Sequence, residues 1–206
     1  MLISRHGFRA FTEYDLNANL ENFLTQLRKE IEADTTLATA DEEAYIQQKV
    51  AAKILKGIEF DTSNITLTQR EEQIPARYFP DQFFMRGERS SYPKPVITFH
   101  VPFSGDKQFL HFQPTTRLMV SEEVSVDNSH VLFDVVNFSN DADQVAKERD
   151  GVVRHLTEQA GYLNKDIAAY NSRLESFVRE AVRGAKVKFK DQSGFLDKLG
   201  NKPKNE

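Results

Sequence analysis

A sustained apolar repeat near the C-terminus restricts the folds open to this chain more than any other feature. From Leu156 to Ala181, apolar side chains recur at alternating steps of four and three positions without a break. This spacing is typical of a long helix that buries one narrow stripe, either on its own chain or on a second copy. We therefore expect a helical region over residues 140–200 and a homo-oligomer formed through its seam. The expected seam residues are Leu156, Leu163, Ile167, Tyr170, Leu174 and Phe177.

Glycines set the expected limits of that helix. Gly151 and Gly161 each weaken a helix by roughly 1 kcal/mol relative to Ala, so a break is expected near one of them. A separate shorter helix is expected from Ser193 to Leu199, followed by a tail or linker over residues 201–206.

The first sixty residues also carry helical periodicity. A stripe from Leu16 to Ile31 predicts one amphipathic helix, and a second stripe from Ile46 to Leu55 predicts another. Thr39 or Asp41 marks the expected start of the second helix, and Gly57 its expected end. A short polar turn between the stripes indicates a helical hairpin over residues 1–60.

Residues 61–138 change character to alternating β-branched and aromatic runs separated by turn residues. Short turns without intervening helices favour an antiparallel sheet of four or five strands. The sequence thus predicts one α+β domain over residues 1–200. Its long C-terminal helix packs on the sheet or forms a coiled-coil-like seam.

One hairpin is expected inside this sheet. The alternating run Val96–Phe103 and the run Phe109–Gln113 flank Gly105-Asp106, which is a two-residue turn signal. The resulting register sets His100 opposite His111.

Opposed histidines in an antiparallel pair lie about 4.5–5.5 Å apart at Cβ, close enough to bind one metal ion. His130 or Asp134 is a candidate third ligand. One interpretation is a small metal-dependent hydrolase centred on His100 and His111. The other is a partly solvated cross-strand pair.

The segment from Pro75 to Pro95 combines aromatic and basic residues in the longest irregular stretch. Such a combination stacks bases or clamps phosphates, and long loops often carry function. The same aromatic side chains can instead fill space between sheet and helix. The ligand-binding candidates are Arg77, Tyr78, Phe84, Arg86, Arg89 and Tyr92.

A basic run near the end of the long helix has two interpretations as well. It either contacts nucleic acid or lies at a solvated helix C-terminus, where cations are favoured by the dipole. A net charge of −4 disfavours general nucleic-acid binding. The run consists of Arg183, Lys186, Lys188 and Lys190.

Composition excludes several classes of protein. The chain has no Cys, which excludes disulfide scaffolds, thiolate metal sites and cysteine nucleophiles. No apolar run approaches eighteen residues, so no membrane partner is expected, and the chain is expected in the cytoplasm. Phosphate-loop, dinucleotide and nucleophile-elbow motifs are absent from the sequence, and neither a catalytic residue nor a cofactor is predicted.

Three segments are similar in sequence character to a known class of bacterial proteins. Phe133–Phe138, Tyr162–Asn171 and Leu199–Pro203 resemble the N-terminal part of large phage-defence proteins, in which a non-catalytic α+β module precedes an effector domain. The resemblance implies a sensor or assembly module, with a fused or partner effector. It transfers no catalytic residue. Together with the seam, it predicts a module that binds a ligand or partner and oligomerises.

Overall fold

The computed structural model describes residues 7–80 and 90–198, with side chains up to residue 191. Its contacts divide the chain into two compact units. The sheet unit comprises Met1–Leu16 and Lys56–Asn164, and the helical unit comprises Asn17–Leu55 and Lys165–Glu206. Both units include part of helix α3 (Ala142–Lys198), and a single domain over residues 1–200 stays a prediction.

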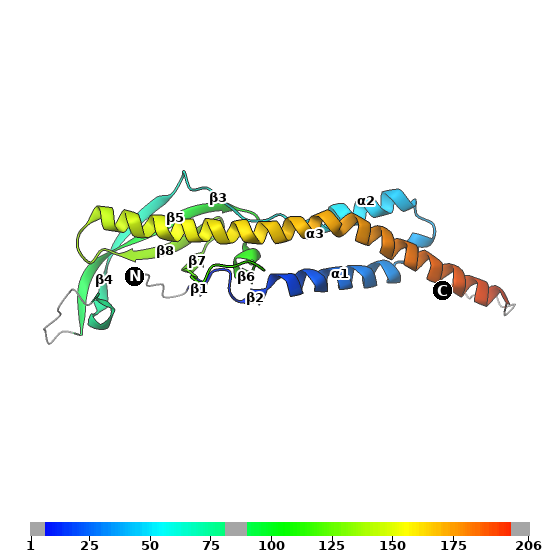
Figure 1. The fold of residues 1–206 in the computed structure, drawn as a ribbon, viewed down its shortest axis with the longest axis horizontal. Coiled ribbons are helices and arrows are strands. Elements are labelled where there is room, and N and C mark those ends of the chain that lie inside the picture. Colours follow the sequence, from blue (N-terminus) through cyan, green and yellow to red (C-terminus); the bar gives the residue numbers. More distant parts are fainter. Residues whose placement is uncertain (1–6, 81–89, 199–206) are drawn as a thin grey trace. The chain divides into compact units, whose positions relative to one another are not determined.

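An antiparallel sheet forms the centre of the sheet unit (Figure 1). Its strand order is β1-β7-β8-β5-β3, and β4 also pairs with β5, while β2 and β6 form a separate parallel pair. The strands are β1 (Phe8–Arg9), β2 (Tyr14–Asp15), β3 (Glu59–Phe60), β4 (Thr66–Pro75), β5 (Ser91–Ser104), β6 (Phe112–Gln113), β7 (Glu123–Val126) and β8 (His130–Val136). Two short 3-10 helices accompany them, Ala76–Tyr78 and Lys107–His111.

One face of this sheet forms the main core. Phe99 on β5 is opposite Phe133 on β8, with ring centroids 5.4 Å apart, and both residues are buried. Burying each such side chain contributes roughly 1.5–3 kcal/mol. The Arg149 guanidinium of α3 lies 5.9 Å from the Phe99 ring centroid, so α3 lies on this face.

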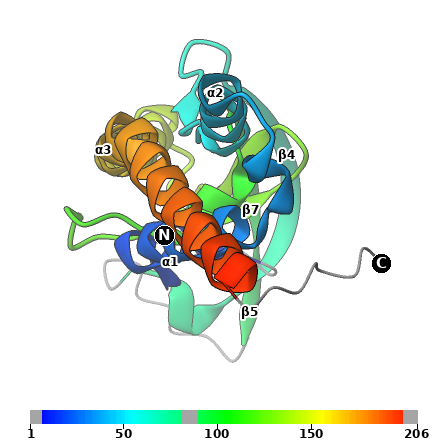
Figure 2. The ribbon, with the colours of Figure 1, turned by 90° about the vertical axis from the view of Figure 1, so that its right-hand side faces the viewer.

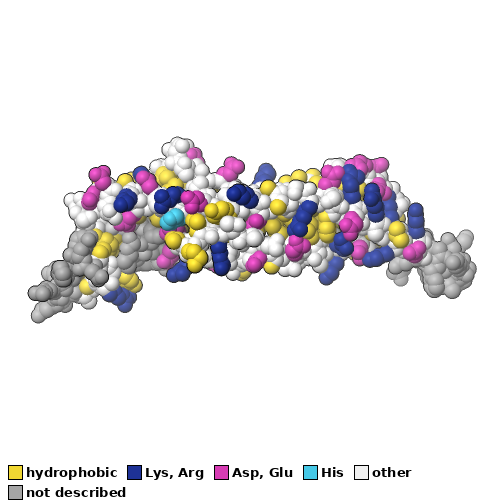
Figure 3. Space-filling model, in the orientation of Figure 1, with side chains coloured by type: hydrophobic (Ala, Val, Ile, Leu, Met, Phe, Trp, Pro, Cys, Tyr) yellow, Lys and Arg dark blue, Asp and Glu magenta, His cyan; other side chains and the backbone are white. Residues whose placement is uncertain are grey.

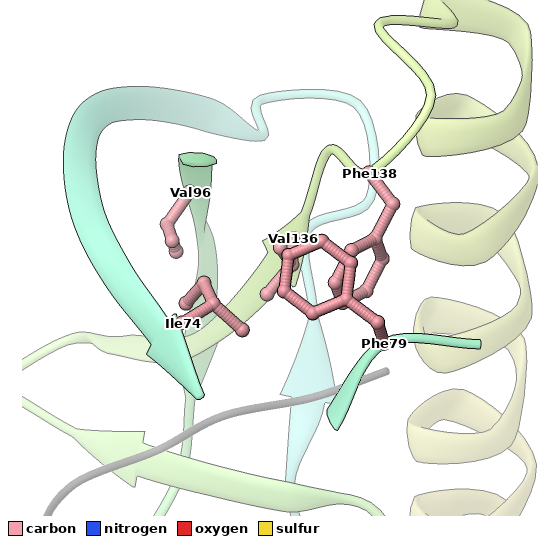
Figure 4. Packing of buried hydrophobic residues seen from close by; sticks show 5 residues of the cluster. All are labelled: Ile74, Phe79, Val96, Val136 and Phe138. Atoms are coloured by element: carbon pink, nitrogen blue, oxygen red, sulfur yellow. The ribbon is translucent and has the colours of Figure 1, made fainter. Parts of the chain in front are cut away.

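A smaller apolar cluster lies at one end of the opposite face (Figure 4). It joins strands β4, β5 and β8 to the segments that follow β4 and β8. The Phe79 and Phe138 rings meet edge to face, with centroids 4.9 Å apart. Its buried members are Ile74, Phe79, Val96, Val136 and Phe138.

Three helical segments build the helical unit: α1 (Leu16–Ala33), α2 (Glu42–Lys53) and the C-terminal part of α3 (Figure 2). The 3-10 helix Thr35–Ala38 connects α1 to α2. Asp41, one of the two predicted starts, caps α2, since its side chain accepts a hydrogen bond from the Ala44 N–H at 2.8 Å. The apolar stripe of α1 is buried, including Leu24, Leu27 and Ile31.

The α+β class, the N-terminal helices, the antiparallel sheet and the long C-terminal helix are all confirmed. Three details differ. Strands β1, β2 and β3 lie within the first sixty residues, which were expected to be helical throughout. Helix α3 also continues through Gly151 and Gly161 and includes residues 193–198. A Cβ at either glycine would have no neighbour within 4 Å, so neither position forces a break.

The predicted hairpin at Gly105 is wrong. Strand β5 runs to Ser104 and pairs there with β3, and residues Lys107–His111 form a 3-10 helix capped by Asp106. Gly105 has φ +105°, and a Cβ on it would lie 2.0 Å from the Gly57 carbonyl oxygen. The segment around Gly57 therefore occupies the space beside this turn.

The α3 seam is buried within its own chain. Leu156 and Leu163 are buried in the sheet unit, and Ile167, Tyr170 and Leu174 in the helical unit. Further along, Val178 is buried and the predicted Phe177 is partly exposed. A straight helix drifts by about 20° per heptad relative to a 3.5-residue repeat, which moves the buried stripe onto the next position.

Candidate functional site

The sheet face opposite Phe99 carries a row of polar side chains from β4, β5 and β8. Register places Thr68, Thr98 and Asp134 side by side across these strands, and Thr66 beside His100. Alternation along the strands adds the positions two residues away. We call this surface the open face. It comprises Thr66, Thr68, Arg70, Glu72, Thr98, His100, His130, Leu132 and Asp134.

Arg70 organises the centre of the open face. Its guanidinium donates to Thr98 Oγ1 at 2.6 Å, to Asp134 Oδ2 at 2.6 Å and to Glu72 Oε2 at 3.1 Å. Thr98 Oγ1 in turn donates to Asp134 Oδ1 at 2.6 Å. The Asp134 carboxylate raises the pKa of Arg70 above its ordinary value, with a smaller contribution from Glu72. This is a charge-paired network with fixed donors and acceptors.

The histidine end of the open face adjoins that network. His100 Nε2 lies 3.2 Å from Thr68 Oγ1, and its ring meets His130 edge to face at 6.3 Å between centroids. His130 Nδ1 lies 3.0 Å from Ser129 Oγ and 3.3 Å from Asp127 Oδ1. The pKa of Asp127 is lowered, mainly by the backbone N–H of Ser129, which stabilises its carboxylate.

The structure does not bring His100 and His111 together. His111 ends the 3-10 helix after β5, stacks on Phe8 at 4.0 Å between ring centroids, and lies 3.1 Å from Glu13 Oε2. Phe8 belongs to β1, which β7 and β8 separate from β5. At 4.7–4.9 Å per strand, that separation is about 14 Å. The predicted pairing is wrong because His100 is opposite Leu132 instead.

Neither predicted third ligand completes a site with both His100 and His111, since His130 lies beside His100 only. Asp134 is engaged by Arg70 and Thr98. Within residues 7–80 and 90–198, no group of three or more His, Cys, Asp or Glu side chains is arranged to hold a metal ion.

Part of the predicted ligand-binding loop packs beside the open face. Tyr78 and Tyr92 are partly buried against the apolar cluster, and the Tyr92 ring meets Phe79 at 5.6 Å. The Arg77 guanidinium lies 4.8 Å from the Tyr78 ring centroid, and Lys94 donates to the Phe138 carbonyl at 2.7 Å. These aromatic residues fill space at the end of the sheet. The other candidates, Phe84, Arg86 and Arg89, lie outside the described residues.

Ion pairs occupy much of the basic run on α3. Lys186 binds Glu42 at 2.8 Å, and Lys188 binds Glu32 at 2.8 Å. Arg183 lies near enough to contribute to the lowered pKa of Glu42, although the hydrogen bond from Lys186 is the larger cause. Figure 3 shows acidic and basic side chains interleaved over the helical unit. Lys186 and Lys188 therefore join α3 to α2 and α1, and the run also includes Lys190.

A cup in the helical unit is lined by Asp34, Tyr45 and Lys49, among others. Asp34 accepts hydrogen bonds from the Tyr45 hydroxyl at 2.8 Å and from the Thr36 hydroxyl at 2.6 Å, and it pairs with Lys49 at 3.2 Å. These bonds lower the pKa of Asp34, and the largest contribution comes from Thr36. Burial raises the pKa of Tyr45, reinforced by Asp34. The arrangement anchors the turn between α1 and α2.

Two groups of functional interest escaped sequence reasoning. Glu122 is buried and its carboxylate lies 2.6 Å from His155 Nδ1 on α3. Asn164 and Asn171 bind the chain backbone beside α3. Their seven-residue spacing along the flank of an apolar stripe is a signal that could have revealed the second group. The first depends on a long-range contact that no local pattern encodes.

No protein-family model, curated protein or solved structure matches the chain. The resemblance to phage-defence modules accordingly stays a hypothesis. No helix among the described residues has the length and apolar character needed to cross a membrane.

Proposed function

We propose that this chain is a non-catalytic binding and assembly module that associates with a second copy through the open face. One observation carries the proposal. α3 lies on one face of the sheet, and the opposite face presents a preorganised polar network beside an apolar cluster.

The side chains of this network favour recognition over catalysis. Arg70, Asp134 and Thr98 use their hydrogen-bonding groups on one another, so they present a fixed pattern. A general acid or base needs instead a group that can exchange a proton with a substrate. A rigid pattern lowers the entropic cost of association, which suits a binding surface.

A second copy suits the chemistry of the open face. A two-fold interface brings the same patch together from both sides, so the patch must be self-complementary. Here a cation, Arg70, lies beside two anions, Glu72 and Asp134, and a partly exposed apolar residue, Leu132, lies two positions from Asp134. The α3 seam residues are already buried, which moves the proposed contact from the helix to the sheet.

The finer parts of the proposal rest on the resemblance and on composition. In it, the module acts in the cytoplasm of a bacterium as the sensor part of a defence protein, and α3 leads to the effector. The loop around Arg77, Tyr78 and Tyr92 is the proposed place of partner capture. Nucleic-acid binding by Arg183, Lys186, Lys188 and Lys190 is not favoured, because acidic partners bind two of these lysines.

Light scattering coupled to size-exclusion chromatography tests the assembly directly. The expected mass is twice the 23.6 kDa of one chain at high concentration. Leu132→Lys introduces a positive charge into the proposed contact and should shift the monomer–dimer equilibrium toward the monomer. Leu67→Lys is the matched control, because Leu67 is 59% exposed and lies on the other face of β4. A wild-type mass of one chain at all concentrations, or equal effects of both variants, would overturn the proposal.

A further inference from the structure

We infer that His100 and His130 form a two-histidine site for a divalent transition metal ion on the open face. Both ligands belong to one chain, so the site needs no second copy to be complete, although it lies on the face proposed as the contact between copies. It differs from the predicted pairing of His100 with His111, which the sheet topology separates.

The pairing of β5 with β8 brings the two imidazoles to a distance suitable for sharing one metal ion. His100 is opposite Leu132, and His130 is opposite Pro102, so the two histidines are diagonal neighbours on adjacent strands. Their ring centroids lie 6.3 Å apart. Two imidazoles that share one metal at about 2.0–2.1 Å per bond have centroids roughly 5–6.5 Å apart.

Neighbouring groups hold each ring by one nitrogen. His130 Nδ1 lies near the Asp127 carboxylate and the Ser129 hydroxyl, which leaves Nε2 as its metal-binding nitrogen. His100 Nε2 lies near the Thr68 hydroxyl, which leaves Nδ1. Metal-binding histidines characteristically use their second nitrogen for such a bond, often to a carboxylate, which fixes the orientation of the ring.

The ligand set determines the class of metal. Imidazole nitrogens suit Zn²⁺, Ni²⁺ and Cu²⁺, whereas Mg²⁺ and Ca²⁺ require oxygen ligands. With two protein ligands, the remaining coordination positions belong to water or to an added ligand. The site is therefore one for an exchangeable ion.

Isothermal titration with ZnCl₂ of the full metal-free chain tests the site. We expect one Zn²⁺ per chain, with affinity reduced about tenfold or more in His100→Gln and His130→Gln, and about tenfold in Asp127→Ala. His111→Gln is the control and should bind as the wild type does. Absence of zinc binding by the wild type, or wild-type affinity in both His100→Gln and His130→Gln, would overturn the site.

A measurement on the unmodified chain removes any dependence on the folding of variants. In NMR spectra, substoichiometric Cu²⁺ should broaden the ring resonances of His100 and His130 before those of His111 and His155. Selective broadening of His111 or His155 instead would contradict the assignment.

Discussion

The side-chain amide of Asn164 forms two hydrogen bonds with the backbone of Ile58. Its Nδ2 donates to the Ile58 carbonyl oxygen at 2.8 Å, and its Oδ1 accepts from the Ile58 N–H at 3.0 Å. Asn171 forms the same pair of bonds with Leu55: its Nδ2 donates to the Leu55 carbonyl oxygen at 2.9 Å, and its Oδ1 accepts from the Leu55 N–H at 3.1 Å. Each amide thus satisfies a backbone donor and acceptor of a segment that lacks a strand partner at that residue, as buried backbone groups require.

Asn164→Ala should lower the free energy of unfolding by about 1–3 kcal/mol, because it leaves two partly buried backbone groups without partners. Urea denaturation followed by circular dichroism measures the change. Glu158→Ala, at an exposed position of the same helix, should change stability by less than about 0.5 kcal/mol. Equal effects of the two variants would show that the Asn164 bonds are dispensable.

Two glycine substitutions should change the stability of the fold in opposite directions. A Cβ on Gly57 would lie 1.9 Å from Asn164 Oδ1, so Gly57→Ala displaces that amide and destabilises the sheet unit. A Cβ on Gly161 meets nothing within 4 Å, so Gly161→Ala should stabilise helix α3 by about 1 kcal/mol. Thermal unfolding of both variants checks the contrast, and a melting temperature raised by Gly57→Ala would contradict the packing.

Acid should weaken the pairing of Glu43 with Arg179. Arg179 donates to both Glu43 oxygens at 2.7 Å, and chiefly for this reason the pKa of Glu43 falls from 4.5 to about 2. Since the folded pKa is depressed, the stabilisation is present above pH 4.5 and is lost between pH 4.5 and 2. Arg179→Gln should flatten the stability profile in that window. Parallel profiles for wild type and variant, measured by denaturation at several pH values, would exclude the effect.

The α3 seam should behave as core. Leu163 is fully buried, so Leu163→Ala should cost about 2–5 kcal/mol of unfolding free energy. Leu67→Ala, at an exposed site, should cost far less. Because the seam lies inside the chain, the folded Leu163→Ala protein should keep the wild-type mass in solution. A change of mass at unchanged stability would return the seam to the role of an interface.

Local patterns were sufficient for the elements that depend on local physics. The stripes of α1 and α3 and the Asp41 cap follow from helical periodicity and capping, and the alternation of Val96–Phe103 follows from the pleat of β5. The chain's class could therefore be predicted as α+β.

Strand pairing could not be predicted, because it depends on contacts far apart in sequence. The turn at Gly105 is a strong local hairpin signal, yet β5 pairs there with β3, more than forty residues earlier in the chain. Because β5 does not pair with the segment that follows it, His111 lies away from His100, and the pairing of β5 with β8 places His130 beside His100. The open face likewise emerged only when the register joined Arg70 to Asp134, sixty-four positions away.

Intermolecular distances between single spin labels test most directly whether the open face is the contact between copies. The chain has no Cys, so Thr66→Cys introduces one labelling site on that face, and Glu158→Cys provides a site on the exposed side of α3. Dipolar spectroscopy should give a defined distance between Thr66→Cys labels, and this dipolar signal should disappear on dilution with unlabelled protein. The distance between Glu158→Cys labels should be longer or unresolved. Absence of dipolar coupling at Thr66→Cys in concentrated protein would contradict the account.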